Sequence, residues 1–146
     1  MLAPTAVREL LELHGRNKTD LIFLSESHLN KCKADELRHF LSFNSMIVVE
    51  SDGRAGGLVL FYHKINKVVL NYVSDNFIDI LFMNEDIVQW RFTGFYGRPS
   101  WSERSLSWDD IRNLHCKGKH PWVVLGDFNE ILLSFEKEGG NARPNL

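Results

Sequence analysis

The apolar positions of this chain fall mostly into short runs separated by turn-forming residues, a pattern that indicates strands more often than helices. Strands are therefore predicted at Leu21–Leu24, Met46–Glu50, Leu58–Tyr62, Lys67–Val73, Phe77–Met83, Ile87–Phe95 and Trp122–Leu125. Turn residues at Asp75-Asn76 and Asn84-Glu85-Asp86 separate the later runs closely. Such short connections predict an antiparallel meander over this part of the chain.

Two segments show helical periodicity instead. The first begins at Pro4-Thr5 and ends at Gly15, with Val7, Leu10, Leu11 and His14 on one face. The second covers Ser102–Leu114 and leads to the last strand, and a short helical turn is expected over Ala34–Leu41. Strands and helices together place the chain in the α/β (α+β) class.

The segment Pro121–Leu132 carries the strongest functional signal. Trp122–Leu125 is apolar without alternation, which predicts a strand covered on both faces, and Gly126 allows the chain to bend just before Asp127. On extended backbone, Asp127 and Asn129 project to the same side. A carboxylate and an amide there could bind a hard cation, orient a water or contact a phosphate oxygen. A plain turn explains the same residues, and the tetrapeptide leaves both interpretations open.

Two other strands also end in polar residues. Glu26 follows Leu21–Leu24, and Tyr96 and Arg98 follow the strand that starts at Ile87. Taken singly, the glutamate is typical of a solvated rim and the tyrosine of a core. A glycine-rich turn before Leu58 lacks the Lys-Ser/Thr pair of a phosphate-binding loop, so a nucleotide cradle is not expected there.

The order of these segments resembles the endonuclease/exonuclease/phosphatase superfamily, which is DNase I-like, and is closest to the endonuclease domain of plant LINE-type retrotransposons. The motifs carrying the resemblance are Leu24-Ser25-Glu26-Ser27-His28, Gly53-Arg54-Ala55-Gly56-Gly57-Leu58, Thr93-Gly94-Phe95-Tyr96-Gly97-Arg98-Pro99, Pro121–Leu132 and Glu136-Lys137-Glu138-Gly139-Gly140. They extend from about Thr5 to the C-terminus, so the match covers nearly the whole chain.

The resemblance implies a DNase I-like four-layer α/β sandwich and a magnesium-dependent phosphodiesterase that nicks DNA in the intact parent. It makes Glu26 a ligand of Mg²⁺, with Mn²⁺ as an alternative, and Asp127 the carboxylate that positions or activates the attacking water. Asn129 would be the amide partner of Asp127, and Tyr96 would hydrogen-bond the scissile phosphate. Arg98 and His28 are weaker candidates for phosphate contacts at the rim.

Three parts of the family pattern fall outside the chain: a first strand carrying an Asn, a later metal-binding Asp and a closing Ser-Asp-His. Residues 1–146 are therefore expected to form a partial domain, roughly the first half of the fold, with one mixed and largely antiparallel sheet, flanking helices and an exposed tail at 134–146. Catalysis is expected to be incomplete in this chain. The alternatives are a non-catalytic remnant and a phosphatase acting on inositol or sphingolipid phosphates.

A half sandwich would leave the inner face of its sheet uncovered. The residues expected to be exposed on that face are Phe23, Leu60, Phe92 and Val124. A large apolar patch of this kind promotes association, so the isolated chain is expected to self-associate. In the parent, the C-terminal half and a reverse transcriptase domain would be covalent partners.

Composition adds little beyond this. A formal net charge of −2 gives no broad attraction to DNA, although Arg98, Arg104, Arg112, Lys117 and Lys119 could follow a phosphate backbone locally. Cys32 and Cys116 suggest neither a disulfide framework nor a zinc motif, even with the nearby His115 and His120. No membrane span and no targeting signal are visible, so an intracellular location is expected, nuclear if the protein is functional.

Overall fold

The computed structural model describes residues 4–51, 56–63 and 67–130. Its helices are α1 (Pro4–Asn17), α2 (Lys31–Phe40) and α3 (Arg104–His115), the last preceded by the 3-10 turn η1 (Trp101–Glu103). Its strands are β1 (Leu21–Leu24), β2 (Ser45–Val49), β3 (Leu58–Tyr62), β4 (Lys67–Ser74), β5 (Phe77–Asn84), β6 (Ile87–Tyr96) and β7 (Trp122–Asp127). Every predicted strand and helix is present, with ends shifted by a few residues.

The strands form two sheets, so the expectation of a single sheet was wrong. The first sheet has the order β1-β3-β2, and the second has the order β4-β5-β6-β7. β3 pairs with β1 on one edge and β2 on the other, so β4 cannot continue the chain beside β3 and instead starts the second sheet. The predicted meander is confirmed for β4, β5 and β6, which are antiparallel, and β7 joins β6 in parallel.

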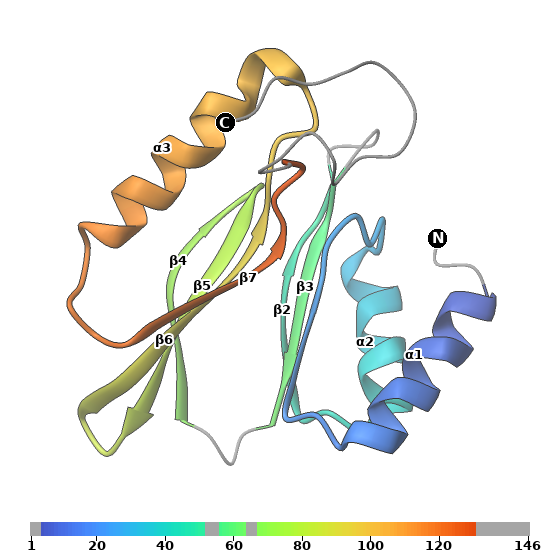
Figure 1. The fold of residues 1–146 in the computed structure, drawn as a ribbon. Coiled ribbons are helices and arrows are strands. Elements are labelled where there is room, and N and C mark those ends of the chain that lie inside the picture. Colours follow the sequence, from blue (N-terminus) through green and yellow to red (C-terminus); the bar gives the residue numbers. More distant parts are fainter. Residues whose placement is uncertain (1–3, 52–55, 64–66, 131–146) are drawn as a thin grey trace.

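The two sheets face each other between helices, which confirms the four-layer α/β sandwich. In Figure 1 the layers follow one another from α3, through the β4–β7 sheet and the β1–β3 sheet, to α1 and α2. Alternation along β3 separates two cores: Val59 and Phe61 pack under the helices α1 and α2, whereas Leu58 and Leu60 pack between the sheets. The fold is therefore built from parts of both sheets and is not one sheet of the sandwich.

This arrangement changes which apolar side chains are exposed. Leu60 and Phe92, expected on an open face, are buried between the sheets, and Phe23 packs against the same inter-sheet core. On β7, by contrast, Val123 (50%) and Leu125 (60%) are exposed. The prediction that β7 is covered on both faces was therefore wrong.

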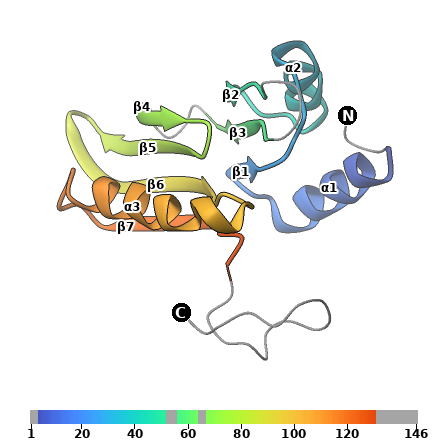
Figure 2. The same cartoon turned by 90° about the horizontal axis from the view of Figure 1, so that it is seen from above.

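The exposure of β7 follows from where the sheets end. In register, Val123 lies opposite Phe92 and Leu125 opposite Gly94, so both side chains point to the inter-sheet side. β1 and β7 are edge strands at the same open side of the two sheets, as Figure 2 shows. Within the described residues, no strand of the first sheet extends beyond β1 to cover Val123 and Leu125.

We expect this open side to drive self-association of the isolated chain. Replacing Val123 and Leu125 together with lysine should shift the chain toward monomer, because two charges on the exposed strand disfavour burial against another molecule. Size-exclusion chromatography with light scattering measures the outcome. Phe40→Lys on α2, where the side chain is 72% exposed, is the matched control and should leave the distribution unchanged. A monomeric unmodified chain would contradict the expectation.

Helix ends are set by local backbone geometry that the periodicity did not reveal. α1 continues through Gly15 to Asn17 and ends where Lys18 adopts a left-handed conformation with φ of 46°. α2 begins before the expected Ala34 because Asn30 caps it, its side chain accepting from the Lys33 amide at 2.9 Å. Among the described residues, no helix is long and apolar enough to span a membrane.

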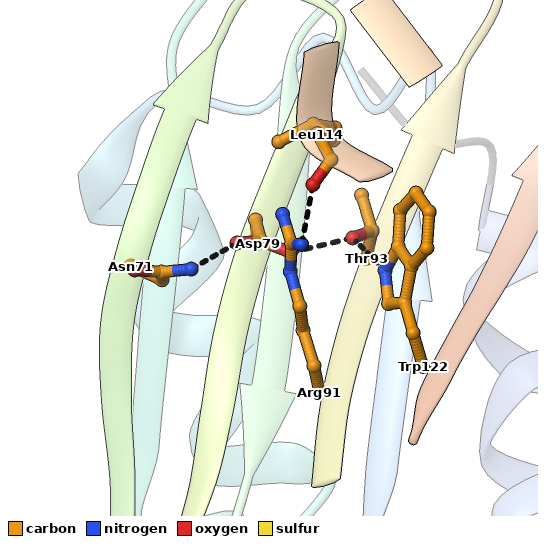
Figure 3. Close-up of polar contacts among 6 residues, drawn as sticks. All are labelled: Asn71, Asp79, Arg91, Thr93, Leu114 and Trp122. Atoms are coloured by element: carbon orange, nitrogen blue, oxygen red, sulfur yellow. Dashed lines mark hydrogen bonds and ion pairs between the residues drawn. The ribbon is translucent and has the colours of Figure 1, made fainter. Parts of the chain in front are cut away.

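The helix α3 is held on the second sheet by buried polar contacts. The Asp79 carboxylate, fully buried on β5, accepts hydrogen bonds from Arg91 Nε at 2.7 Å and Thr93 Oγ1 at 2.5 Å on β6. Arg91 Nη1 then donates to the carbonyl of Leu114 at 2.6 Å, near the end of α3 (Figure 3). The ion pair therefore fixes the last turn of α3 to the sheet.

Further bonds complete this network at both sides. Asn71 on β4 donates to the second oxygen of Asp79 at 2.8 Å, and Trp122 Nε1 on β7 donates to Thr93 Oγ1 at 2.8 Å. The Arg91 guanidinium also lies 4.8 Å from the centre of the Trp122 ring. All four strands of the second sheet and α3 thus meet at one buried polar cluster, which sets the position of β7 beside β6.

Candidate functional site

The predicted site residues come together at one edge of the molecule. Tyr96 ends β6, and Asp127 ends β7 directly opposite it in the parallel register. Glu26 lies two residues beyond β1, in the loop that leads toward α2. Because β6 and β7 are parallel neighbours, their carboxyl ends meet at the same sheet edge, and the hydrogen bond from Tyr96 to Glu26 brings the loop after β1 to that edge.

Tyr96 is the centre of this arrangement. The residue is almost fully buried, 4% exposed, and its hydroxyl donates a hydrogen bond to Glu26 Oε1. The backbone of Tyr96 is fixed from both sides by Asn76: its amide donates to the Asn76 carbonyl at 2.7 Å, and Asn76 Nδ2 donates to its carbonyl at 2.9 Å. The tyrosine is therefore rigidly placed and bridges the two sheets through Glu26.

The environment keeps Tyr96 protonated. Burial, the hydrogen bond to Glu26 and the negative charges of Glu26 and Asp127 raise the pKa of Tyr96 to about 12, against a smaller lowering by the Asn129 side chain. A neutral phenol is a hydrogen-bond donor throughout the physiological range. Tyr96 can thus donate to a negatively charged ligand but cannot serve as a base near neutral pH.

Removing the Glu26 charge should lower the pKa of Tyr96 toward its ordinary value of 10.0. The measurement is tyrosinate absorbance against pH for the unmodified chain and Glu26→Gln, with Tyr96→Phe subtracted to remove Tyr62 and Tyr72. Because the folded state holds the Tyr96 proton more tightly, its stabilising effect is complete below pH 10 and is lost as the pH rises toward 12. A pKa that is unchanged in Glu26→Gln would show that the contact does not exist in solution.

The segment after β7 is a turn whose side chains also reach the site. The Asn129 amide donates to Asp127 Oδ1 at 2.8 Å, and Asn129 has φ of 52°, so the expected extended backbone here was wrong. A turn in which an Asp side chain accepts a hydrogen bond from the backbone amide two residues later is an Asx turn. The turn is therefore confirmed, and binding of a cation, a water or a phosphate oxygen by its side chains stays a prediction.

Gly97 ties this turn to the end of β6. Its amide donates to the Asp127 carbonyl at 2.7 Å, and its own carbonyl accepts from Asn129 Nδ2 at 2.7 Å. A Cβ at Gly97 would overlap the backbone of Phe128, so only glycine permits this approach. The pair of hydrogen bonds keeps the Asp127 and Asn129 side chains beside Tyr96.

Left-handed backbone is concentrated around the same edge. Glu26 and His28 each have φ of 49°, and Asn129 has 52°, whereas only three other non-glycine residues of the described chain have positive φ. For Glu26 and His28 this region is costly, on the order of 1–3 kcal/mol for each residue. Such conformations persist where surrounding contacts impose them, which is typical of functional loops.

The two weaker candidates are not part of this cluster. Arg98 Nη1 instead pairs with Asp110 Oδ2 on α3 at 2.7 Å, and the Arg98 amide donates to Ser107 Oγ. His28 is exposed in the loop after Glu26, where its amide donates to the Gly56 carbonyl at 3.4 Å. Their predicted phosphate contacts stay predictions.

The donor chemistry of the site suits a hard cation. Glu26, Asp127 and Asn129 offer only oxygen ligands, the type that magnesium and manganese prefer. Among the described residues, no group of three or more His, Cys, Asp or Glu side chains is gathered closely enough to enclose a metal. Magnesium commonly keeps several waters and takes only one or two carboxylates from the protein, so Glu26 fits as a ligand of that kind.

Sequence reasoning missed two groups of residues near the site. Asn76, interpreted as a turn residue, holds the Tyr96 backbone, and the Asp79–Arg91 pair positions β6 and β7. A signal for the pair was present, because opposite charges occur within otherwise apolar runs on two adjacent predicted strands. Nothing in the sequence indicated the role of Asn76.

The four layers, with polar strand ends gathered at one edge, define a DNase I-like fold. The chain belongs to the endonuclease/exonuclease/phosphatase family, whose model matches residues 2–146. The motif segment at 136–140 and the expected tail at 134–146 lie outside the described residues. No curated protein matches the sequence.

Solved structures support the same fold. A humanised TDP2 of D. rerio is 13% identical to this chain with a TM-score of 0.63, and the matched region covers 86% of this chain and 58% of the TDP2 chain. An AP endonuclease from Archaeoglobus fulgidus is 13% identical with a TM-score of 0.64, and the match covers 92% of this chain and 56% of the endonuclease chain. A 3′ phosphatase NExo variant from Neisseria, bound to a product DNA hairpin, is 15% identical with a TM-score of 0.60. The match covers 86% of this chain and 53% of the phosphatase chain. The chain therefore spans somewhat more than half the length of these proteins.

Proposed function

We propose that this chain is a metal-dependent phosphodiesterase module acting on DNA, with its site at Glu26, Tyr96, Asp127 and Asn129. The observation that carries the proposal is the contact of Tyr96 with Glu26 beside Asp127, which joins the ends of three strands. A protonated phenol, two carboxylates and an amide provide a donor, acceptors and an orienting group for hydrolysis at a phosphate. The order of the sequence motifs supports the same assignment as this geometry.

Each side chain would have a separate task. Tyr96 would donate its hydroxyl to a non-bridging phosphate oxygen, where negative charge increases as the bond to the attacking oxygen forms. Asp127, exposed at the end of β7, would accept a proton from the attacking water or hold that water in line. Asn129, held by Gly97, would keep Asp127 and the water in place. These roles require no large movement of the described backbone.

Glu26 is the residue that would hold a divalent cation, magnesium by preference. Bound there, the ion would offset charge on the phosphate and lower the pKa of a coordinated water. The Tyr96 hydroxyl, which donates to Glu26 in this structure, would turn to donate to the substrate phosphate. Phosphate contacts from His28 and Arg98 would add to this, and Arg98 would then have to leave Asp110.

Retrotransposon origin is the second part of the proposal. The ordered motifs, in particular Thr93–Pro99 and Pro121–Leu132, support it. With a LINE-type origin, the substrate would be genomic DNA and the protein would act in the nucleus. A reverse transcriptase domain would be its covalent partner. The formal net charge of −2 means that other parts of the parent would supply most of the electrostatic attraction to DNA.

Nicking of supercoiled plasmid by the purified chain tests the proposal. Because catalysis is expected to be incomplete in this chain, we expect at most slow conversion to the open circle in magnesium, with loss of that conversion in EDTA and in Glu26→Gln. Glu36→Gln, which removes an exposed carboxylate on α2 that has no role in the proposed site, is the matched control. Conversion that persists in Glu26→Gln would refute the assigned site. No conversion above the EDTA level would contradict an active module and favour the non-catalytic remnant.

A further inference from the structure

A surface pocket lies next to the proposed site, at the start of α3. It has a volume of about 310 Å³ and is lined, within the described residues, by Trp101, Arg104, Ser105, Trp108 and Glu130. Glu130 directly follows Asn129, so the turn that carries the site also forms one wall of the pocket. None of the roles proposed for the site uses these residues.

The pocket is walled by aromatic rings. Trp101 on η1 is 60% exposed, although a tryptophan carries one of the largest apolar surfaces of any residue. Trp108 is half-buried and lies against Phe128, with ring centres 5.9 Å apart and planes at 25°. Phe128 lies between Asp127 and Asn129, so this stack connects the pocket directly to the site turn. An exposed indole beside a hollow is a surface on which a flat ring can stack.

The charges around the pocket are balanced. Arg104 Nη1 pairs with Glu130 Oε1 at 3.1 Å, and both side chains are only 10% exposed. The Arg104 guanidinium also lies 5.2 Å from the centre of the Trp101 ring. Because the cation is already neutralised and a carboxylate lines the same wall, a phosphate group would be poorly held here. An uncharged planar ligand fits better.

One buried polar atom in this wall still needs an acceptor. Arg104 Nε is buried and finds no hydrogen-bond partner within the described part of the chain. A buried donor without a partner is costly, so an acceptor atom at the edge of a ligand would be favoured there. Nucleobases combine a stacking face with ring nitrogen and carbonyl acceptors at the edge.

We propose that this pocket binds the base of a DNA nucleotide adjacent to the scissile phosphate. The proposal rests on the proposed function, because that function places a phosphodiester beside Asp127 and Tyr96. Trp101 would supply the stacking platform, with Trp108 as the inner wall and Arg104 as the donor at the edge. Stacking on indole tolerates every base, so the pocket would hold an unpaired nucleotide with little sequence preference.

The test is binding of a fluorescein-labelled oligothymidine of about 12 nucleotides, within the usual range of single-strand sites. Anisotropy is measured in EDTA, so that no turnover is needed. Trp101→Ala is expected to weaken binding about tenfold, and Trp101→Phe should restore most of the affinity. Phe40→Ala, which removes an exposed ring on α2, is the matched control and should have no effect.

A second oligonucleotide of equal length, with abasic sites in place of the bases, separates base contacts from backbone contacts. We expect Trp101→Ala to have no effect on its binding. Equal losses for both oligonucleotides, unchanged affinity for oligothymidine, or no binding by the unmodified chain would each overturn the pocket proposal. Nicking that depends on Glu26 would still stand in those cases, so failure of the pocket and failure of the site are distinguishable.

Discussion

Asparagine in place of Asp127 is expected to lower the rate of magnesium-dependent plasmid nicking by roughly 10²- to 10⁴-fold, the usual contribution of a positioned general base. Asparagine cannot accept a proton from water at neutral pH. Its side-chain oxygen can still accept the Asn129 amide, which in the native turn lies 2.8 Å from Asp127 Oδ1. The turn should therefore persist, and the loss should reflect chemistry.

The control for this variant is Asp109→Asn, which removes an exposed carboxylate on α3 that pairs only with Arg112 in the described structure. It changes the net charge by the same amount and should leave nicking unaffected. Circular dichroism of both variants checks that the fold is retained. A rate for Asp127→Asn within a factor of two of the unmodified chain would remove Asp127 from the proposed mechanism.

Alanine at Asp79 is expected to destabilise the chain by about 3–5 kcal/mol, because it leaves the buried Arg91 guanidinium without its counter-charge. Both side chains are essentially inaccessible, at 3% for Arg91 and 0% for Asp79. Domains have total free energies of unfolding of roughly 5–15 kcal/mol, so a loss of this size removes a large fraction of the stability. Urea denaturation followed by tryptophan fluorescence measures the change in the free energy of unfolding.

Two comparisons give this result its meaning. Asp109→Ala breaks an exposed pair with Arg112 and should cost no more than about 1 kcal/mol. A double variant, Asp79→Leu with Arg91→Met, replaces both charges with apolar side chains and should be much less damaging than Asp79→Ala alone. If Asp79→Ala cost no more than the exposed control, the buried network would not be holding α3 to the sheet.

The strands and helices could be predicted from the sequence because each has its own local period. β5 and β6 alternate between a core face and the face under α3, and α1 carries its apolar residues on one side. The division into two sheets could not be predicted in this way. It depends on which strands pair with one another, for example on β3 lying between β1 and β2. These pairings join distant parts of the chain, and the local periodicity does not reveal them.

The site shows the same division. Glu26, Tyr96, Asp127 and Asn129 were predicted through the resemblance, and the structure places them together, although their catalytic roles stay proposals. The supporting contacts were not predictable, because they depend on how distant segments approach one another: Asn76 holds the Tyr96 backbone through its carbonyl and its side-chain amide, and Gly97 meets the turn after β7. The pocket at Trp101 also depends on the three-dimensional approach of η1 to the turn after β7.

Each sheet is assembled from one continuous stretch of chain: β1 to β3 make the first, and β4 to β7 make the second. Within the described residues, no ladder hydrogen bonds cross from one sheet to the other, so each half can form its own backbone bonds before the halves meet. Glu26 and Tyr96, 70 positions apart, come into contact only after that meeting. Assembly of the site would then be among the last events of folding, and two separately produced halves, divided between β3 and β4, form a natural pair for a split-protein complementation assay.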